Sequence, residues 1–439
     1  LRVFDRVISR RSVMQYKGES MPLAEIGADL NVQAVVEGSV MLMGDRVQVT
    51  AFLLDAARDK QLWTETFDEP VANIMNIQGR IVTAIAQAVR LELDPGAQAR
   101  LREMGTVNPV AHKACMRGYD WLVNSGSEEE WALAGKYFNE AIAADSTFAL
   151  AHAGLAEWLV RSSHNSEGPP PGMLDRARAA VDRAIELDPE LAEAHMTRGH
   201  LFWEHLYEIE EGGRSIERAI ELNPSLAYAY GMQAYYFETL GRYEESVAAV
   251  RKTIELDPES LFMNAVIIEP LGMAGKYDEA LAQIDNIREK FPSYEGWRHH
   301  KFYVFNWQGK LEEALPLFEE IKPEDRTPSD KEDMIEILTG LDRMDDARKI
   351  FKDYRAEAEK DSLFASLSSL AFALGDTAAS LAYLEQLEKV EPQSIMFLIP
   401  LHAMHGNFDQ AFAYLEEAYD RKFNWMTRLG VYPKMGTAW

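Results

Sequence analysis

The chain has 439 residues, and its 71 acidic and 45 basic side chains give a formal net charge of −26. Residues 1–109 hold 14 acidic and 12 basic side chains, which leaves 57 and 33 for residues 110–439, and this acidic later part argues against binding to nucleic acid or anionic membranes. The single cysteine, Cys115, excludes an internal disulfide and a multi-cysteine metal site, and no run approaches the roughly 18 apolar residues that span a bilayer.

Two neighbouring strands are predicted near the start of the chain. Residues 47–54 alternate between two faces with the two-residue period of a strand. Residues 35–42 form a second such run, and Gly44-Asp45 between the two runs is typical of a tight hairpin turn. The sequence therefore predicts an antiparallel hairpin in this region.

Three further elements are expected around this hairpin. Residues 6–13 are interpreted as a short strand and residues 22–30 as a short helix. Residues 71–93 carry apolar side chains at positions 74, 77, 81, 85 and 89, a helical spacing that would place one face on the sheet. Together these elements predict a small α/β or α+β domain.

A fixed period governs the middle of the chain. Proline recurs at Pro189, Pro224, Pro258 and Pro292, in steps of 35, 34 and 34 residues, and the first three close the phrases AIELDP, AIELNP and TIELDP. A period of this length indicates stacked supersecondary units, none of which can bury its apolar face alone. The sequence predicts a helical solenoid over most of the chain.

Each unit is expected to contain two antiparallel helices. Glycine between the helices, as at Gly241 and Gly275, accepts a left-handed backbone and ends the first helix. Proline after the second helix cannot continue it, so the chain must turn into the next unit. Weaker versions of the pattern extend in both directions and predict nine helix pairs between about residue 110 and residue 425. Residues 163–172 are expected to form an inserted loop, and residues 323–330 to kink the array or to end one segment of it.

These repeated phrases resemble the tetratricopeptide repeat family. The resemblance covers roughly 315 positions and implies a mostly α-helical superhelix over residues 110–425, followed by a tail over residues 426–439. In that family the first helices of the units line a concave groove. The resemblance departs from the family at Gly212, Ser246 and Ser380, where alanine is usual, and all three residues are small.

The first hundred residues resemble the TolB amino-terminal-like module of bacterial signalling proteins. The matching stretches are ISRRSVMQYKG at residues 8–18, VVEGSV at 35–40, LDA at 54–56 and LW at 62–63. The resemblance implies a module over residues 1–103 that is incomplete at its start, because family members begin with a further strand and helix. A sheet that lacks them would have an unprotected edge, which we expect to pair with a partner or a second copy.

The sequence predicts neither a cofactor nor a metal site. No phosphate-binding loop with the Gly-x-x-x-x-Gly-Lys-Ser/Thr spacing occurs, and no nucleophile with a recognisable base is apparent. His200, Glu204, His205 and the earlier His195 do not form a His-Glu-x-x-His pattern, so histidines that line a groove or satisfy a helix are the simpler interpretation. We therefore expect no catalytic residue in this chain.

The groove, by contrast, gives specific candidates. Carrying the groove positions of the tetratricopeptide family onto this sequence assigns a lining rich in aromatic side chains and nearly without lysine, arginine or asparagine, which indicates an apolar or aromatic peptide as ligand. The alternative is that these side chains pack between helices or that neighbouring units close the groove. The assigned residues are His200, Trp203, Glu204, Tyr228, Tyr235, Glu238, His299, His300, Tyr303, Asn306 and Trp307.

Three functions remain open from the sequence. The first is a protein-binding scaffold or sensor region of a larger bacterial signalling protein. The second is the regulatory portion of a nucleotide cyclase or kinase whose catalytic domain lies outside this chain, since the module resemblance implies such effectors. The third is a periplasmic assembly factor, and the sequence does not decide between a cytoplasmic and a periplasmic location.

Overall fold

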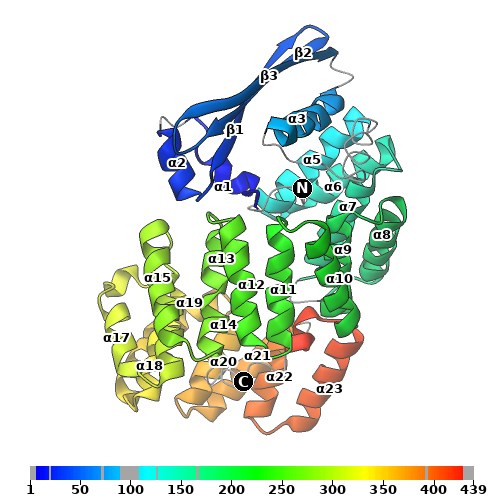
Figure 1. The fold of residues 1–439 in the computed structure, drawn as a ribbon. Helices are drawn as coiled ribbons and strands as arrows, with labels where there is room; N and C mark the ends of the chain where they lie inside the picture. Colours follow the sequence, from blue (N-terminus) through cyan, green and yellow to red (C-terminus); the bar gives the residue numbers. More distant parts are fainter. Residues whose placement is uncertain are drawn as a thin grey trace.

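A small sheet module lies beside a long curved array of helices (Figure 1). This computed structural model describes residues 6–18, 21–70, 74–88, 108–124, 127–164, 168–390 and 394–428. Within these ranges, no helix combines the length and the hydrophobicity needed to span a bilayer. The predicted fold class, a helical solenoid preceded by a small α/β module, is confirmed.

The module contains an antiparallel sheet with the strand order β1-β2-β3, formed by β1 (Ala34–Met43), β2 (Arg46–Asp55) and β3 (Lys60–Pro70). The predicted hairpin is confirmed, because Met43 pairs with Arg46 across Gly44-Asp45. One face of the sheet packs on α3 (Ile74–Ala88), and this core contains Val47, Phe67 and Ile77. A short helix, α2 (Leu23–Asp29), precedes β1 as expected. Positions 71–73 and 89–93 of the predicted helix lie outside the described residues.

The predicted strand over residues 6–13 is wrong. The chain instead begins a helix, α1 (Arg10–Met14), because the Ser9 side chain accepts a hydrogen bond from the backbone of Ser12 and caps its first turn. The same two serines donate hydrogen bonds to Asp257 Oδ1 in the solenoid, at 2.5 Å from Ser9 and 2.7 Å from Ser12. The segment therefore docks on the repeats and contributes nothing to the sheet.

The solenoid follows the predicted repeat of two antiparallel helices, and consecutive helices pack as hairpins. Within the described ranges they form nine pairs along the chain: α5 (Pro109–Asn124) with α6 (Glu128–Ala144), α7 (Ala149–Ser162) with α8 (Met173–Leu187), α9 (Ala192–His200) and the π-helix η2 (Leu201–His205) with α10 (Ile209–Leu222), α11 (Ala227–Thr239) with α12 (Tyr243–Leu256), α13 (Leu261–Val266) and α14 (Ile268–Met273) with α15 (Tyr277–Lys290), α16 (Trp297–Gln308) with α17 (Leu311–Glu319), α18 (Pro328–Gly340) with α19 (Met344–Lys360), α20 (Phe364–Ala373) with α21 (Thr377–Val390), and α22 (Ile395–Met404) with α23 (Phe408–Asp420).

The periodic prolines have the role that the sequence predicts. Pro189, Pro224, Pro258 and Pro292 each follow directly after the residue that caps the second helix of a unit. Over residues 323–330, a short 3-10 helix, η3 (Pro323–Asp325), is followed by a capping box between Thr327 and Asp330 that starts α18 at once. The array therefore continues through this stretch.

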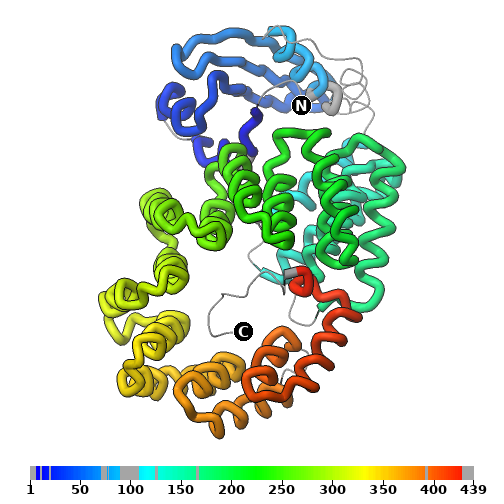
Figure 2. The backbone as a smooth tube through the Cα atoms, turned by 60° about the horizontal axis from the view of Figure 1, so that its bottom comes forward, coloured from blue at the N-terminus to red at the C-terminus, as the bar shows by residue number. Residues whose placement is uncertain are grey.

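The end of the solenoid returns to its third and fourth helix pairs. A short 3-10 helix, η4 (Asn424–Arg428), contacts η2 and α11, so the helices wrap into a closed curve (Figure 2). The Tyr207 hydroxyl donates a hydrogen bond of 2.9 Å to the carbonyl of Phe423, and the Lys422 ammonium lies over the rings of Tyr207 and Tyr419. This contact joins residues more than 200 positions apart, which no local pattern in the sequence indicates.

Candidate binding cavity and buried histidine cluster

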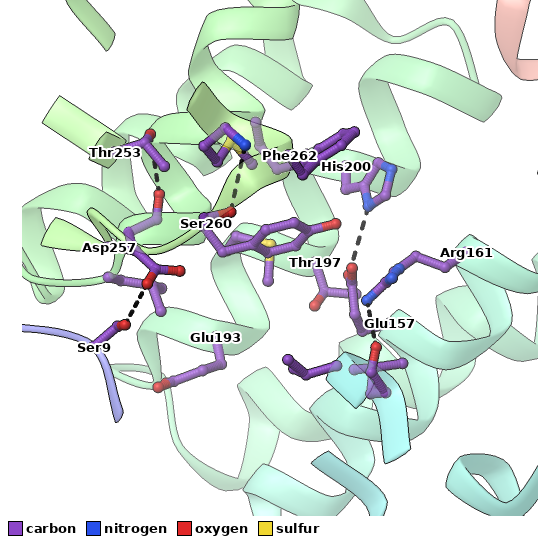
Figure 3. Close-up of a pocket in the computed structure, with 18 of the residues that line it drawn as sticks. Ser9, Glu157, Arg161, Glu193, Thr197, His200, Thr253, Asp257, Ser260 and Phe262 are labelled. Atoms are coloured by element: carbon purple, nitrogen blue, oxygen red, sulfur yellow. Dashed lines mark hydrogen bonds and ion pairs between the residues drawn. The ribbon is translucent and has the colours of Figure 1, made fainter. Parts of the chain in front are cut away.

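A cavity of about 1030 Å³ lies among the first five helix pairs of the solenoid. Its walls come from α5, α7, α9, η2, α11 and α13, with Ser9 and Met14 entering from the amino-terminal segment and Asn424 from η4. Figure 3 shows the side chains of Glu157, Arg161 and His200 on one side of this space, and those of Ser9 and Asp257 on another. Segments from both ends of the chain therefore help to enclose the cavity.

Five of the predicted groove residues line this one cavity, namely His200, Trp203, Glu204, Tyr228 and Tyr235. Trp203 is fully buried, and its indole nitrogen donates a hydrogen bond to Thr239, so it is held as part of the core. Tyr228 and Tyr235 are only partly buried. The two tyrosines, more than the tryptophan, could contact a ligand in the cavity.

Glu238 and the later five residues lie elsewhere. Glu238 is buried and accepts a hydrogen bond from Ser246 at 3.0 Å. The five α16 residues, His299, His300, Tyr303, Asn306 and Trp307, do not belong to the cavity lining. His299 pairs with Asp333 on α18, His300 pairs with Tyr294, and Trp307 packs against Gly272, while Tyr303 is exposed. The single continuous lining that the sequence predicts is therefore divided between two regions.

A cluster of charged side chains forms one wall of the cavity. His200 is buried between two carboxylates, with its Nε2 atom 2.8 Å from Glu204 Oε2 and its Nδ1 atom 3.5 Å from Glu157 Oε2. Burial opposes a charge on the imidazole, but Glu157 and Glu204 outweigh it and raise the pKa of His200 to about 9. His200 is therefore a cation at neutral pH.

The two carboxylates stay ionised for the complementary reason. Burial alone would raise the pKa of Glu157, but the charges of His200 and Arg161 lower it below its usual value. Hydrogen bonds from His164 and His200 lower the pKa of Glu204 strongly against the same burial. The wall therefore holds two buried anions beside His200 and Arg161, in a nearly balanced arrangement.

Three members of this wall escaped the sequence analysis. His164 lies in the inserted loop, and its Nε2 atom is 2.8 Å from Glu204 Oε2. Glu157 and Arg161 are on α7, and the Arg161 guanidinium donates a hydrogen bond to the carbonyl of Leu122 and stacks on Trp131. A glutamate and an arginine four positions apart on a first helix are a signal that could have directed attention to this unit.

The neighbouring His205 has a different role. Its Nε2 atom lies 3.0 Å from Ser163 Oγ, and its Nδ1 atom lies 3.2 Å from the carbonyl of Lys422. Burial lowers the pKa of His205 to about 4, so the ring is neutral. His205 therefore connects the wall of the cavity to the returning end of the chain.

Comparisons with known proteins match the repeats. The family model described as tetratricopeptide repeat matches residues 227–260. A protein from Rhizobium meliloti (strain 1021) named "Putative adenylate cyclase 3" is 28% identical over 194 residues, which are 44% of this chain and 32% of the relative. The chain thus spans about a third of the length of the relative that it matches.

Solved structures with a similar arrangement include two bacterial tetratricopeptide repeat proteins. The one from Parabacteroides merdae ATCC 43184 is 16% identical, with a TM-score of 0.40 over 61% of this chain and 99% of that chain. A thermophilic one from Thermus thermophilus is also 16% identical, with a TM-score of 0.37 over 44% of this chain and 98% of that chain. The family model matches one helix pair, α11 with α12, and the helix pairs before and after it repeat the same layout, so the chain contains a tetratricopeptide repeat within its solenoid.

Proposed function

We propose that the cavity binds a segment of another protein, and that this chain is the interaction or sensor region of a larger bacterial regulator. Repeat solenoids commonly bind partners on their concave surface. The observation that carries the proposal is that five residues assigned to the groove by the family resemblance line one partly open cavity of about 1030 Å³. Pockets of roughly this size bury a ligand well.

The lining favours an apolar or aromatic anchor. Tyr228, Tyr235 and Phe262 supply aromatic surface, and Met196, Met232 and Met263 supply flexible apolar surface that adapts to the shape of a side chain. Such surfaces bind protein segments through one or two buried anchor side chains. A phenylalanine, leucine or methionine of the partner would fit this part of the wall.

The charge of the lining adds a second preference. Glu193 lines the cavity, and burial raises the pKa of its carboxyl group above the usual value. Asp120 and Asp257 add two more carboxylates, and the Arg161 guanidinium already bonds to the carbonyl of Leu122. A lysine, an arginine or a free amino terminus on the partner would offset the unfavourable burial of Glu193. The preferred ligand is therefore an apolar segment that also carries a positive group.

A peptide screen tests this preference directly. Fluorescence polarisation of the full chain against octapeptides would vary the anchor (Phe, Leu or Ser) and one nearby charge (Lys or Glu) independently. We expect peptides with Phe and Lys to bind more tightly than those with Phe and Glu, and Glu193→Gln to reduce that difference. Equal binding of the Lys and Glu peptides to the wild-type protein would contradict the charge preference.

The named relative supports the placement of this chain in a regulator. It carries the words "Putative adenylate cyclase 3", and the match covers a part of this chain only. The resemblance of the first hundred residues to the TolB amino-terminal-like module favours the same placement. We expect the chain by itself to form no cyclic nucleotide from ATP or GTP in a coupled assay. Formation of cyclic AMP that follows the purified chain through several columns would contradict a purely regulatory role.

A further inference from the structure

Three side chains with metal-binding atoms meet at the wall of the cavity. His164 Nε2, His200 Nε2 and Glu204 Oε2 all lie within 4.8 Å of one another. Both nitrogen atoms are 2.8 Å from the same carboxylate oxygen. The spacing of His200 and Glu204 alone does not form a recognisable motif, and His164, the third member, comes from a different repeat.

We propose that His164, His200 and Glu204 bind a divalent transition-metal cation of the zinc type, which displaces the proton of His200 to solvent and leaves the remaining coordination position open to the cavity. Two imidazoles and one carboxylate form a ligand set that zinc uses when a fourth position is left for water or a ligand. Imidazole nitrogen also suits zinc and its neighbours better than calcium or magnesium, which prefer oxygen ligands.

The geometry requires only a small adjustment. A tetrahedral zinc ion with bonds of about 2.0–2.2 Å places neighbouring ligand atoms roughly 3.4 Å apart. The three atoms lie within 4.8 Å of one another, so side-chain rotations that move them by about 1 Å would bring them to these positions. The cluster borders the cavity, which leaves the fourth position accessible.

The backbone at this cluster departs from the regular α-helix. The first helix of the third unit changes from α9 into the π-helix η2, where the Leu206 amide bonds to the carbonyl of Leu201 at 3.1 Å. The distortion begins right after His200 and includes Glu204. Single π-helical turns inside α-helices are frequent at functional sites.

Glu157 provides the outer support that metal-bound histidines usually have. Its Oε2 atom lies 3.5 Å from His200 Nδ1, the imidazole nitrogen that would not face the metal. Among the described residues, the two carboxylate oxygens of Glu157 form no hydrogen bond of ordinary geometry. The same holds for His200 Nδ1, although all three atoms are buried. A carboxylate on the outer nitrogen of a ligating histidine fixes the tautomer and the orientation of the ring. A rotation of His200 toward a metal could shorten this contact.

Zinc titration of the full chain tests the site. After treatment with a chelator and its removal, isothermal titration calorimetry with ZnCl₂ should give one tight site per chain, and Co²⁺ should give the visible absorption of a tetrahedral complex. We expect His164→Ala to weaken Zn²⁺ binding by about 100-fold or more, and Glu157→Gln, a positioning residue, by about 10-fold. Because His164 is exposed at the end of α7, its substitution should leave the helical circular dichroism unchanged.

A matched control distinguishes this site from general binding to surface histidines. His195 is a partly buried histidine on α9 whose Nε2 atom contacts the carbonyl of Pro189, and His195→Ala should retain the affinity of the wild type. Equal affinities for Zn²⁺ in the wild type and in His164→Ala would overturn the proposal, as would an equal loss in His195→Ala. The cluster would then be a hydrogen-bonded network only. Neither result bears on the peptide screen, which does not depend on a metal.

Discussion

Two groups of carboxylates in the solenoid, one in each half, have pKa values shifted in opposite directions. Beside the cavity, Glu157 and Glu204 have lowered pKa values because His200 and other cations outweigh the effect of burial. On α18, burial and the neighbouring Asp333 and Glu332 raise the pKa of Glu336 to about 7. Burial raises the pKa in both groups, so the difference between Glu204 and Glu336 comes from their neighbours, which are histidines beside Glu204 and carboxylates beside Glu336.

The two halves also differ in how exposed their concave side chains are. In the first half, the concave side chains enclose a cavity whose walls include segments from both ends of the chain. In the second half, Tyr303 on α16 is exposed, and the neighbouring His299 pairs with Asp333 on α18. Equivalent positions of a repeat thus become an enclosed pocket or an open surface, depending on what packs across from them.

The largest effect is expected from Gly212→Ala, which should disrupt the first half alone. A methyl group at this position would lie 2.4 Å from Trp203 Cβ and 2.7 Å from its backbone nitrogen, so the two helices would have to separate. We expect the free energy of unfolding to fall by about 2 kcal/mol, a net value that includes the gain in helix propensity from glycine to alanine. Hydrogen exchange should show faster opening in α9 to α12 and little change in α18 to α21.

The adjacent Gly213→Ala serves as the control for this change. Its methyl group would meet the end of the Tyr236 ring at 2.5 Å, and a partly exposed side chain can move more easily than backbone. The loss of stability should therefore be clearly smaller. Equal losses in the two variants, measured by urea unfolding, would show that close packing on Trp203 is not what limits this position.

The next effect concerns Glu336 and the pH dependence of the second half. Its pKa is about 7 in the folded chain and 4.5 in the unfolded reference, so unfolding releases a proton between these values and stability falls as the pH rises from about 4.5 to 7. Glu336→Gln should remove this loss and stabilise the protein at pH 8 by about 1–2 kcal/mol. Urea unfolding at pH 5 and pH 8 would measure it, with the exposed Glu312→Gln on α17 as the unchanged reference. The same increase in stability at both pH values would contradict the titration of Glu336.

A smaller effect separates the two regions as binding sites. Tyr235→Ala should weaken the best peptide from the screen by about 5-fold, which corresponds to ~1 kcal/mol, because it removes a wall of the cavity. Tyr303→Ala on α16 should leave the affinity unchanged. Fluorescence polarisation would measure both affinities. A loss in Tyr303→Ala and none in Tyr235→Ala would indicate that the peptide binds to the second half of the solenoid.

The smallest effect is expected at the sheet edge, where a second copy was predicted to pair. The β1 side chains Val40 and Leu42 are 70% and 68% exposed, and β1 has no strand on its outer side among the described residues. Val40→Lys should reduce any concentration-dependent association seen by light scattering, since a charge on an edge strand opposes pairing. A wild-type chain that stays monomeric at every concentration would rule out this self-association.

The solenoid was predictable because its signals are local and repeated. The four prolines, together with Gly241 and Gly275, act through their own backbone preferences, and both glycines have the expected positive φ values. The strand β3 was missed because charged and polar residues separate its few apolar residues, Leu62, Trp63 and Phe67, and leave no regular alternation. The strand predicted over residues 6–13 was wrong because a serine cap and docking on Asp257 outweigh its apolar pattern.

The candidate site was only partly predictable for a different reason. His200, Trp203 and Glu204 could be assigned because they follow the repeat register, whereas His164 belongs to an insertion that has no register. The closing contact between Tyr207 and Phe423 depends on the accumulated curvature of the whole array. Neither feature has a periodic signal, so spacing along the chain could not predict it.

The return of η4 to η2 has a mechanical consequence. An open solenoid stretches like a spring, because its two ends separate without breaking any contact between them. Here tension between the third and last units would act first on the hydrogen bond from Tyr207 to Phe423 and on the contact between His205 and Lys422. These two contacts hold the curve closed. If they broke, the opening of the cavity would widen before any helix pair separated.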